Sequence, residues 1–205
     1  MIQIFVHRAV LNSKENTLEG IRNCIRLNIG LEIDLRYDKD VYLSHDENKN
    51  YQFFEDACKI LSLTKTKIVL HVKEIQAIKE VVRLVNKYSI NQNCIIFMDT
   101  VDYLQLVGLA GKDVEVAYYA SYKPMNYKPI TYWCDELADN WYDKNIIDSL
   151  HKNNKIMYAM SKELIHRTDL DEIKKEWGRL LDLGFDGICT DYPLKLRRFI
   201  KERGR

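Results

Sequence analysis

The chain has 205 residues, of which 46% are hydrophobic, so one domain with a substantial core is expected. Its 31 lysines and arginines nearly balance 30 aspartates and glutamates, so charge does not favour nucleic acid or an anionic membrane as a partner. No stretch is apolar over the length of a bilayer span, and no secretory segment is expected. The five scattered cysteines show no metal-binding spacing and indicate reduced core thiols in a cytoplasmic protein.

Eight short apolar runs rich in Ile, Val, Tyr and Phe predict eight β-strands. They lie at residues 2–6, 31–36, 67–72, 94–98, 114–119, 130–134, 155–160 and 187–190. Between most of them the apolar residues follow a helical period, as in 15–28, which we expect to end just before Gly30, and in 75–88.

Strands that alternate with helices imply right-handed crossovers and a parallel sheet. Eight such units favour a closed (β/α)8 TIM barrel, formed as a single domain over residues 1–205 and near the lower size limit of this fold. An open doubly wound sheet is the alternative, but no glycine-rich phosphate loop follows the first strand.

The second predicted strand carries two carboxylates, Glu32 and Asp34, on one face. Side chains two residues apart in a strand point the same way, roughly 7 Å from each other. Two such charges repel, so the pair needs a cation, a proton or water. In the structural alternative, the two acids pair with Arg8 and Arg36.

Other polar residues follow the predicted strands at the end where barrels carry their chemistry. The first strand ends in His7 and Arg8, an extension of the second leads to His45, and the third carries His71 and ends in Lys73.

Several segments, in this order, resemble the glycerophosphodiester phosphodiesterase family. They are HRAVLNSKENT (7–17), EID (32–34), SHD (44–46), LHVK (70–73) and GFDGICTDYP (184–193). The resemblance implies a barrel that hydrolyses a small phosphodiester with one divalent ion, Mg²⁺, Ca²⁺ or Mn²⁺. By position it makes Glu32 and Asp34 metal ligands, His7 and His45 the catalytic acid and base, and Arg8 and Lys73 the phosphate-binding residues.

Three departures from the family pattern matter. Ala9 stands where the family has glycine, which implies a negative φ at this position. Residues 47–66 are too few for the small subdomain that members insert over the barrel mouth, so a more open site is expected. His71 stands in place of the third acidic ligand, and imidazole suits transition metals better than calcium or magnesium.

Four interpretations of His71 remain open. It can be the third metal ligand, or it can contact the phosphate. Another acid can complete the metal shell, the candidates being Asp99, Asp135 and Glu136. Finally, it can be a buried histidine held by a backbone carbonyl.

Three functions are compatible with these residues. The first is metal-dependent hydrolysis of a small polyol-derived or lipid-derived diester with two-histidine acid–base catalysis. The second is a lyase reaction, as in the related phospholipase barrels, in which a neighbouring substrate hydroxyl attacks and a cyclic phosphate is released. The third is a barrel that binds a phosphorylated ligand without turnover.

Overall fold

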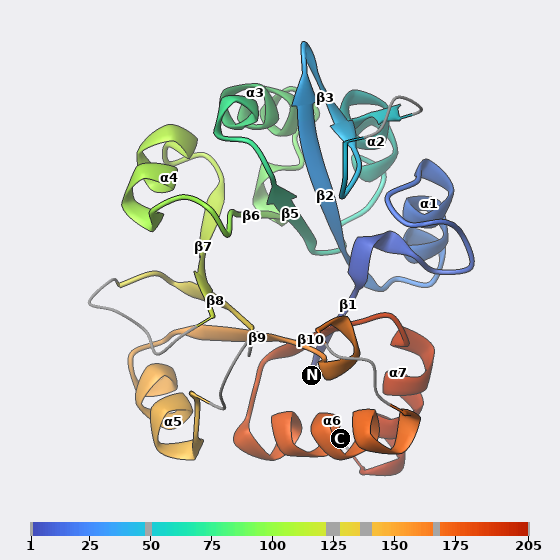
Figure 1. Ribbon diagram of the computed structural model, residues 1–205, viewed down its shortest axis with the longest axis vertical. Helices are drawn as coiled ribbons and strands as arrows, with labels where there is room; N and C mark the ends of the chain where they lie inside the picture. The colour runs from blue at the N-terminus through green and yellow to red at the C-terminus, as the bar shows by residue number, and fades with distance from the viewer. Residues whose placement is uncertain (1, 48–50, 122–127, 136–140, 166–168, 205) are drawn as a thin grey trace. The chain divides into compact units, whose positions relative to one another are not determined.

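The computed structural model describes residues 2–47, 51–121, 128–135, 141–165 and 169–204. All eight predicted strands are present, with bounds that differ from the prediction by at most two residues (Figure 1). They are β1 Gln3–Val6, β2 Gly30–Asp38, β5 Ile68–Val72, β6 Cys94–Phe97, β7 Glu115–Ala120, β8 Thr131–Cys134, β9 Ile156–Met160 and β10 Gly187–Thr190.

These strands hydrogen-bond in the order β1-β10-β9-β8-β7-β6-β5-β2, and β1 also pairs with β2. The pairs from β2 to β5 and onward to β10 are parallel. The sheet therefore closes on itself, which confirms the (β/α)8 barrel and shows that the open doubly wound alternative is wrong. Two antiparallel strands, β3 Asp40–Leu43 and β4 Gln52–Phe53, extend the sheet from β2.

The chain forms two compact units, Val6–Val116 and Met1–Phe5 with Ala117–Arg205. In the first unit α1 packs on α2, α2 on α3 and α3 on α4. These helices are α1 Leu18–Arg26, α2 Phe54–Leu61, α3 Ile78–Lys87 and α4 Tyr103–Ala110, and the short 3-10 helices are η1 His7–Ala9, η2 Ile75–Ala77 and η3 Asn91–Asn93.

The bounds of α1 follow from its capping residues. Thr17 precedes the helix and its hydroxyl accepts the Gly20 N–H, which satisfies a backbone donor of the first turn. At the other end Asn28 has a φ of 48°, so the left-handed residue that follows the helix is Asn28. Gly30, which we expected just past the helix end, instead begins β2.

The turn at η1 contradicts the expectation for Ala9, whose φ is +49°, next to +47° at Arg8. Left-handed backbone costs a residue other than glycine roughly 1–2 kcal/mol. The packing of α1 explains the turn, because the Ala9 carbonyl comes so close to Gly20 that a Cβ there would lie 2.0 Å from its oxygen. The same turn directs the Arg8 N–H at Glu32.

The second unit contains α5 Lys144–Lys152, the 3-10 helix η4 Lys162–Leu164, α6 Leu170–Leu183 and α7 Pro193–Glu202. An aromatic cluster fills its core: the Phe5 ring centroid is 5.5 Å from that of Trp133 and 4.9 Å from that of Tyr158, both edge-on. Edge-on contacts of this kind add stability beyond the apolar area that they bury.

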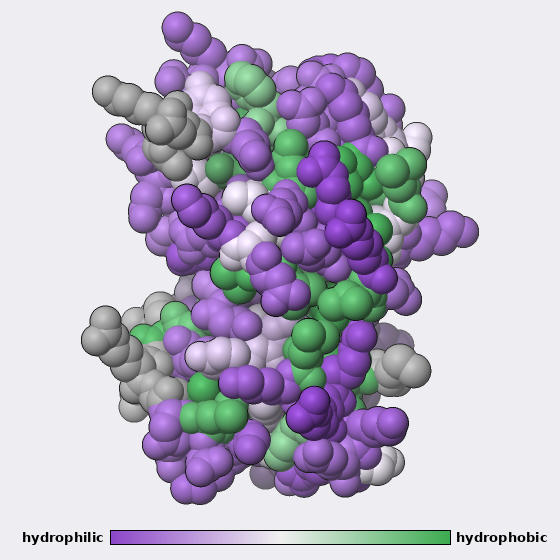
Figure 2. Space-filling view, turned by 90° about the vertical axis from the view of Figure 1, so that its right-hand side faces the viewer, coloured by the Kyte–Doolittle hydropathy of each residue, from purple (hydrophilic) through white to green (hydrophobic). Residues whose placement is uncertain are grey.

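Hydrophilic residues cover most of the face seen in Figure 2, with smaller apolar areas between them. All five cysteines are buried and free, as expected for reduced core thiols. None of the helices in the described part of the chain combines the length and the apolar character that crossing a membrane requires.

Candidate active site

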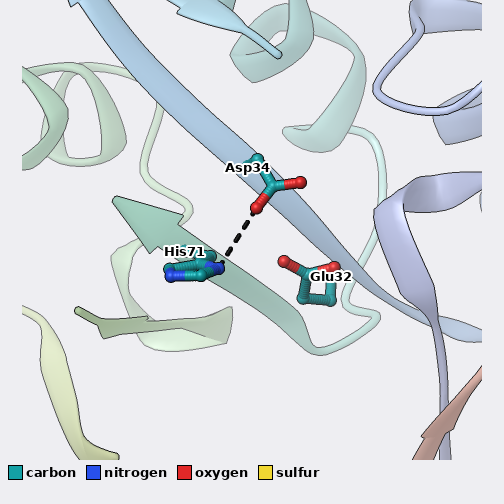
Figure 3. Close-up of side chains that lie close together, drawn as sticks. All are labelled: Glu32, Asp34 and His71. Carbon is teal, nitrogen blue, oxygen red and sulfur yellow. Dashed lines mark ion pairs between the residues drawn. The ribbon is translucent and has the colours of Figure 1, made fainter. Parts of the chain in front are cut away.

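The acid pair on β2 lies beside His71 on β5. The register of the two strands puts Asp34 directly opposite His71, and Glu32 lies two residues earlier on the same face of β2. One ligand atom from each of the three side chains lies within 4.8 Å of the other two. Figure 3 shows the three side chains pointing toward one another from the two strands. Among the described residues, no other three acids, histidines or cysteines form such a group.

Asp34 is surrounded by donors. Its Oδ1 lies 3.1 Å from His71 Nδ1 and 3.3 Å from Lys73 Nζ. Its Oδ2 accepts a hydrogen bond of 3.0 Å from Asn16 Nδ2 and lies 3.3 Å from Arg8 Nε. Burial raises the pKa of Asp34, but the hydrogen bond and charge of His71 outweigh it, with help from Lys73 and Asn16, and the pKa falls well below its usual value.

Glu32 has the opposite electrostatic balance. It is 3% exposed, and its Oε2 accepts the Arg8 backbone N–H at 2.8 Å. Burial and the charge of Asp34 raise the pKa of Glu32, against the opposing charges of His7 and His71. An ionised Glu32 therefore needs additional positive charge in this site.

The donor set fits a divalent cation. Two carboxylates offer the hard oxygens that such ions prefer, and the imidazole of His71 adds the nitrogen that transition metals accept. A cation between the three groups would also offset the charge that raises the pKa of Glu32. The arrangement can therefore hold a metal ion and has cationic side chains beside it for a phosphate.

His71 is held by two carboxylates, not by a backbone carbonyl as one interpretation had it. Its Nε2 lies 3.4 Å from Asp99 Oδ1, on the side of the ring away from Asp34. Burial lowers the pKa of His71, but the hydrogen bonds to Asp34 and Asp99 raise it above its usual value.

His45 follows the β2–β3 hairpin. The hairpin continues beyond β3, where the Ser44 N–H donates to the Asp34 carbonyl at 3.2 Å. The half-buried ring of His45 faces Asp46, with 2.9 Å between Nδ1 and Oδ1. Arg36 holds the same segment by donating from Nε to the His45 carbonyl at 2.8 Å.

Arg36 does not pair with the two acids, contrary to the structural alternative. Its Nη1 forms an ion pair with Glu74, which also accepts the Tyr37 N–H at 3.1 Å. Arg8 does pair with Asp34, so that part of the alternative is confirmed. Arg36 thus links the segment that carries His45 to the end of β5.

The remaining candidates for the metal shell are placed differently. Asp99 contacts His71. Asp135 belongs to the unit Ala117–Arg205, where its Oδ2 accepts the Tyr119 hydroxyl at 2.9 Å. Glu136 lies outside the described residues. The seven predicted site residues and Asp99 all belong to the unit Val6–Val116.

Two contributors were missed by the sequence analysis, Asn16 and Glu74. Asn16 binds Asp34 through its side-chain amide and also accepts the Asp34 N–H at 2.9 Å. Its place in the ENT segment was the available signal in the sequence. In the structure Asn16 is buried, and a buried polar residue needs a partner. Glu74 follows Lys73 directly, but nothing local indicates that it pairs with Arg36.

No protein-family model matches the chain, and no curated protein matches it in sequence. Solved structures do match it in fold. A glycerophosphoryl diester phosphodiesterase from Parabacteroides distasonis has a TM-score of 0.77 at 15% identity, covering 99% of this chain and 87% of that one. For glycerophosphodiester phosphodiesterases from Agrobacterium tumefaciens and Thermotoga maritima the TM-scores are 0.73 and 0.70, the identities 15% and 19%. The match to the Agrobacterium tumefaciens structure covers 98% of this chain and 100% of that one. The match to the Thermotoga maritima structure covers 99% of each chain. The chain therefore has the fold of these phosphodiesterases, as the resemblance in sequence implied.

Proposed function

We propose that this protein is a metal-dependent phosphodiesterase that hydrolyses a small diester of the glycerophosphodiester type. The observation that carries the proposal is the group formed by Glu32 and Asp34 on β2 and His71 on β5. Arg8 and Lys73 lie beside this group, each in contact with Asp34. The names of the structures that share the fold support the same reaction class. The formal charge of +1 supports a small substrate over nucleic acid.

The cationic side chains would bind the phosphate. A phosphodiester carries one negative charge, and more charge develops as the reaction proceeds. Arg8 and Lys73 both contact the carboxylate of Asp34 in this structure. A bound phosphate would replace this carboxylate as the partner of the two cationic side chains. A divalent ion held by Glu32, Asp34 and His71 would supply Lewis-acid polarisation of a phosphoryl oxygen.

The two histidines would transfer the protons. An imidazole titrates near neutrality, so it can take a proton from the attacking oxygen or return one to the leaving oxygen. Asp46 Oδ1 lies 2.9 Å from Nδ1 of His45, so Nε2 would be the nitrogen that serves the substrate. The charge of His7 acts on Glu32, which supports a place for His7 in the same site.

A metal titration with a chromogenic phosphodiester tests the proposal. We expect chelator-treated protein to be inactive and one divalent ion to restore turnover. The products of a panel of glycerophosphodiesters then separate hydrolysis, which releases a phosphomonoester, from the lyase reaction, which releases a cyclic phosphate. If glycerol phosphate raises the melting temperature and no diester is turned over with any divalent ion, the protein is a binding barrel and the proposal is wrong.

We also infer a cytoplasmic location, which the five free, buried cysteines support. Fractionation of cells that express the tagged chain tests this inference, and recovery outside the cytoplasmic fraction would contradict it.

A further inference from the structure

The ring of His71 is held on its face as well as on its edge. Register pairs His71 on β5 with Phe97 on β6, and the two rings stack with 4.2 Å between centroids and 19° between planes. Stacking on a flat, buried phenyl ring restricts rotation of the imidazole about its own axis. The plane of His71 is therefore set by the neighbouring strand.

The edge of the ring is held by the residue two positions beyond Phe97. Asp99 Oδ1 lies 3.4 Å from His71 Nε2, while Nδ1 lies 3.1 Å from Asp34 Oδ1. Each ring nitrogen of His71 thus lies next to a different carboxylate. Nδ1 is the nitrogen that contacts Asp34 of the metal-binding group.

A metal ligand must offer a lone pair, and a neutral imidazole has one. Which nitrogen carries it depends on the hydrogen bond that the other nitrogen makes. A carboxylate that accepts the Nε2 proton, as Asp99 is placed to do, leaves Nδ1, which contacts Asp34 in this structure, as the nitrogen that would give up its proton and offer a lone pair when a metal ion binds. Lys73 Nζ lies 3.1 Å from Nδ1 and 3.3 Å from Nε2, so its contact does not distinguish the two nitrogens, and the assignment rests on Asp99.

We propose that Asp99 is a positioning residue that, together with Phe97, presents Nδ1 of His71 to the metal ion and makes the site select transition metals over magnesium and calcium. The proposal rests on the metal-dependent function proposed above and adds the residue that decides metal preference. A nitrogen ligand in a fixed orientation favours manganese, iron, cobalt or zinc, whereas magnesium and calcium prefer oxygen alone.

Isothermal titration of the intact chain with Mn²⁺, Zn²⁺ and Mg²⁺ tests the proposal, with the visible spectrum of bound Co²⁺ as a second readout. We expect Asp99→Asn to weaken Mn²⁺ and Zn²⁺ binding by roughly 10- to 100-fold, to change Mg²⁺ binding much less, and to alter the Co²⁺ spectrum. Asp113→Asn is the matched control, because Asp113 is an exposed acid of the same unit whose side chain contacts Asn86. It should leave the affinities and the spectrum unchanged.

A double-mutant cycle separates positioning from direct binding. In a His71→Ala background, Asp99→Asn should add less than about twofold, because Asp99 acts through the imidazole. Phe97→Leu, which keeps Asp99 and removes the stack, should weaken Mn²⁺ binding in the wild-type background. Far-ultraviolet circular dichroism confirms that each variant is folded.

The outcomes are distinguishable. If wild type binds Mn²⁺ and Asp99→Asn binds it equally with the same Co²⁺ spectrum, the inference is wrong while the proposed function stands. If the effect of Asp99→Asn persists in full without His71, Asp99 is itself a ligand and the positioning role is wrong. If wild type binds no divalent ion, the metal-dependent function and the inference both fail.

Discussion

His71 lies directly across the sheet from Asp34, and its Nδ1 is 3.1 Å from the carboxylate Oδ1. This pair puts a nitrogen where the resemblance places a third acidic ligand. The nitrogen lowers the negative charge of the site by one unit relative to three acids, which weakens the hold on hard cations. Metal preference is therefore the property that most directly tests the role of His71.

We predict that His71→Asp shifts the metal that gives the highest turnover toward magnesium or calcium and keeps some activity. His71→Ala should weaken binding of every divalent ion, because it removes a ligand and replaces it with nothing. Turnover of wild type and both variants across a metal series checks this. Identical metal profiles in wild type and His71→Asp would mean that His71 is outside the metal shell.

Glu32→Gln and Asp34→Asn should each reduce metal affinity by about tenfold or more, because each replaces a charged oxygen ligand with a neutral amide. Both side chains are buried, so circular dichroism must show that the variants fold. Titration calorimetry gives the affinities, and assays in excess chelator give the metal-free activity. Full turnover by the wild-type protein in excess chelator would show that neither acid supports the reaction by binding a metal ion.

Replacement of either histidine proposed as acid or base should slow the reaction while the protein stays folded. We predict that His7→Ala and His45→Ala each lose ~10²-fold or more in kcat, since each removes one proton-transfer group. His151→Ala is a suitable control, because His151 pairs with Asp186 in the other unit. A variant with wild-type turnover would eliminate that histidine from the mechanism.

Arg36→Ala should lower kcat by roughly 10- to 100-fold and leave metal affinity unchanged, because Arg36 holds the backbone of His45 and contacts none of the three proposed ligands. Arg83→Ala removes an exposed arginine that pairs with Glu80 and serves as the control. Steady-state kinetics and Mn²⁺ titration of the two variants give the comparison. An equal loss of metal affinity and turnover in Arg36→Ala would point to general disruption of the site.

The five buried thiols should not react with a thiol reagent in the folded protein, and all five should react after denaturation.

Burial raises the pKa of Cys24 from 9.0 to about 12, so the unfolded chain loses this proton at lower pH than the folded one. Stability should therefore fall as pH rises above 9. Melting temperatures at about pH 8 and about pH 10 measure the fall, which should be smaller in Cys24→Ala. Rapid modification of the native protein would contradict the buried environment.

The fold was predictable because its signals are local. Each barrel strand is buried and parallel, so it reads as a short apolar run, and the runs alternate with helical periods. The strand bounds differ from the prediction by at most two residues. The shared face of Glu32 and Asp34 also follows from local geometry, since alternate residues of any strand point the same way.

The left-handed turn at Ala9 was not predictable from the residue itself. Alanine disfavours a positive φ, and the expectation was set by that local preference. The structure places the Ala9 carbonyl against Gly20 of α1, and this packing overrides the preference. A sequence read one segment at a time does not contain the contact.

The contacts that define the site are likewise tertiary. The sequence by itself determined that the two acids share a face, because side chains alternate along a strand. It also placed His71 on the next predicted strand of the barrel. Only register decided that His71 faces Asp34 on one side and Phe97 on the other, with Asp99 at its second nitrogen. A shift of one residue in the register of β5 would turn His71 to the opposite face, away from Asp34 and Phe97, because side chains alternate along a strand.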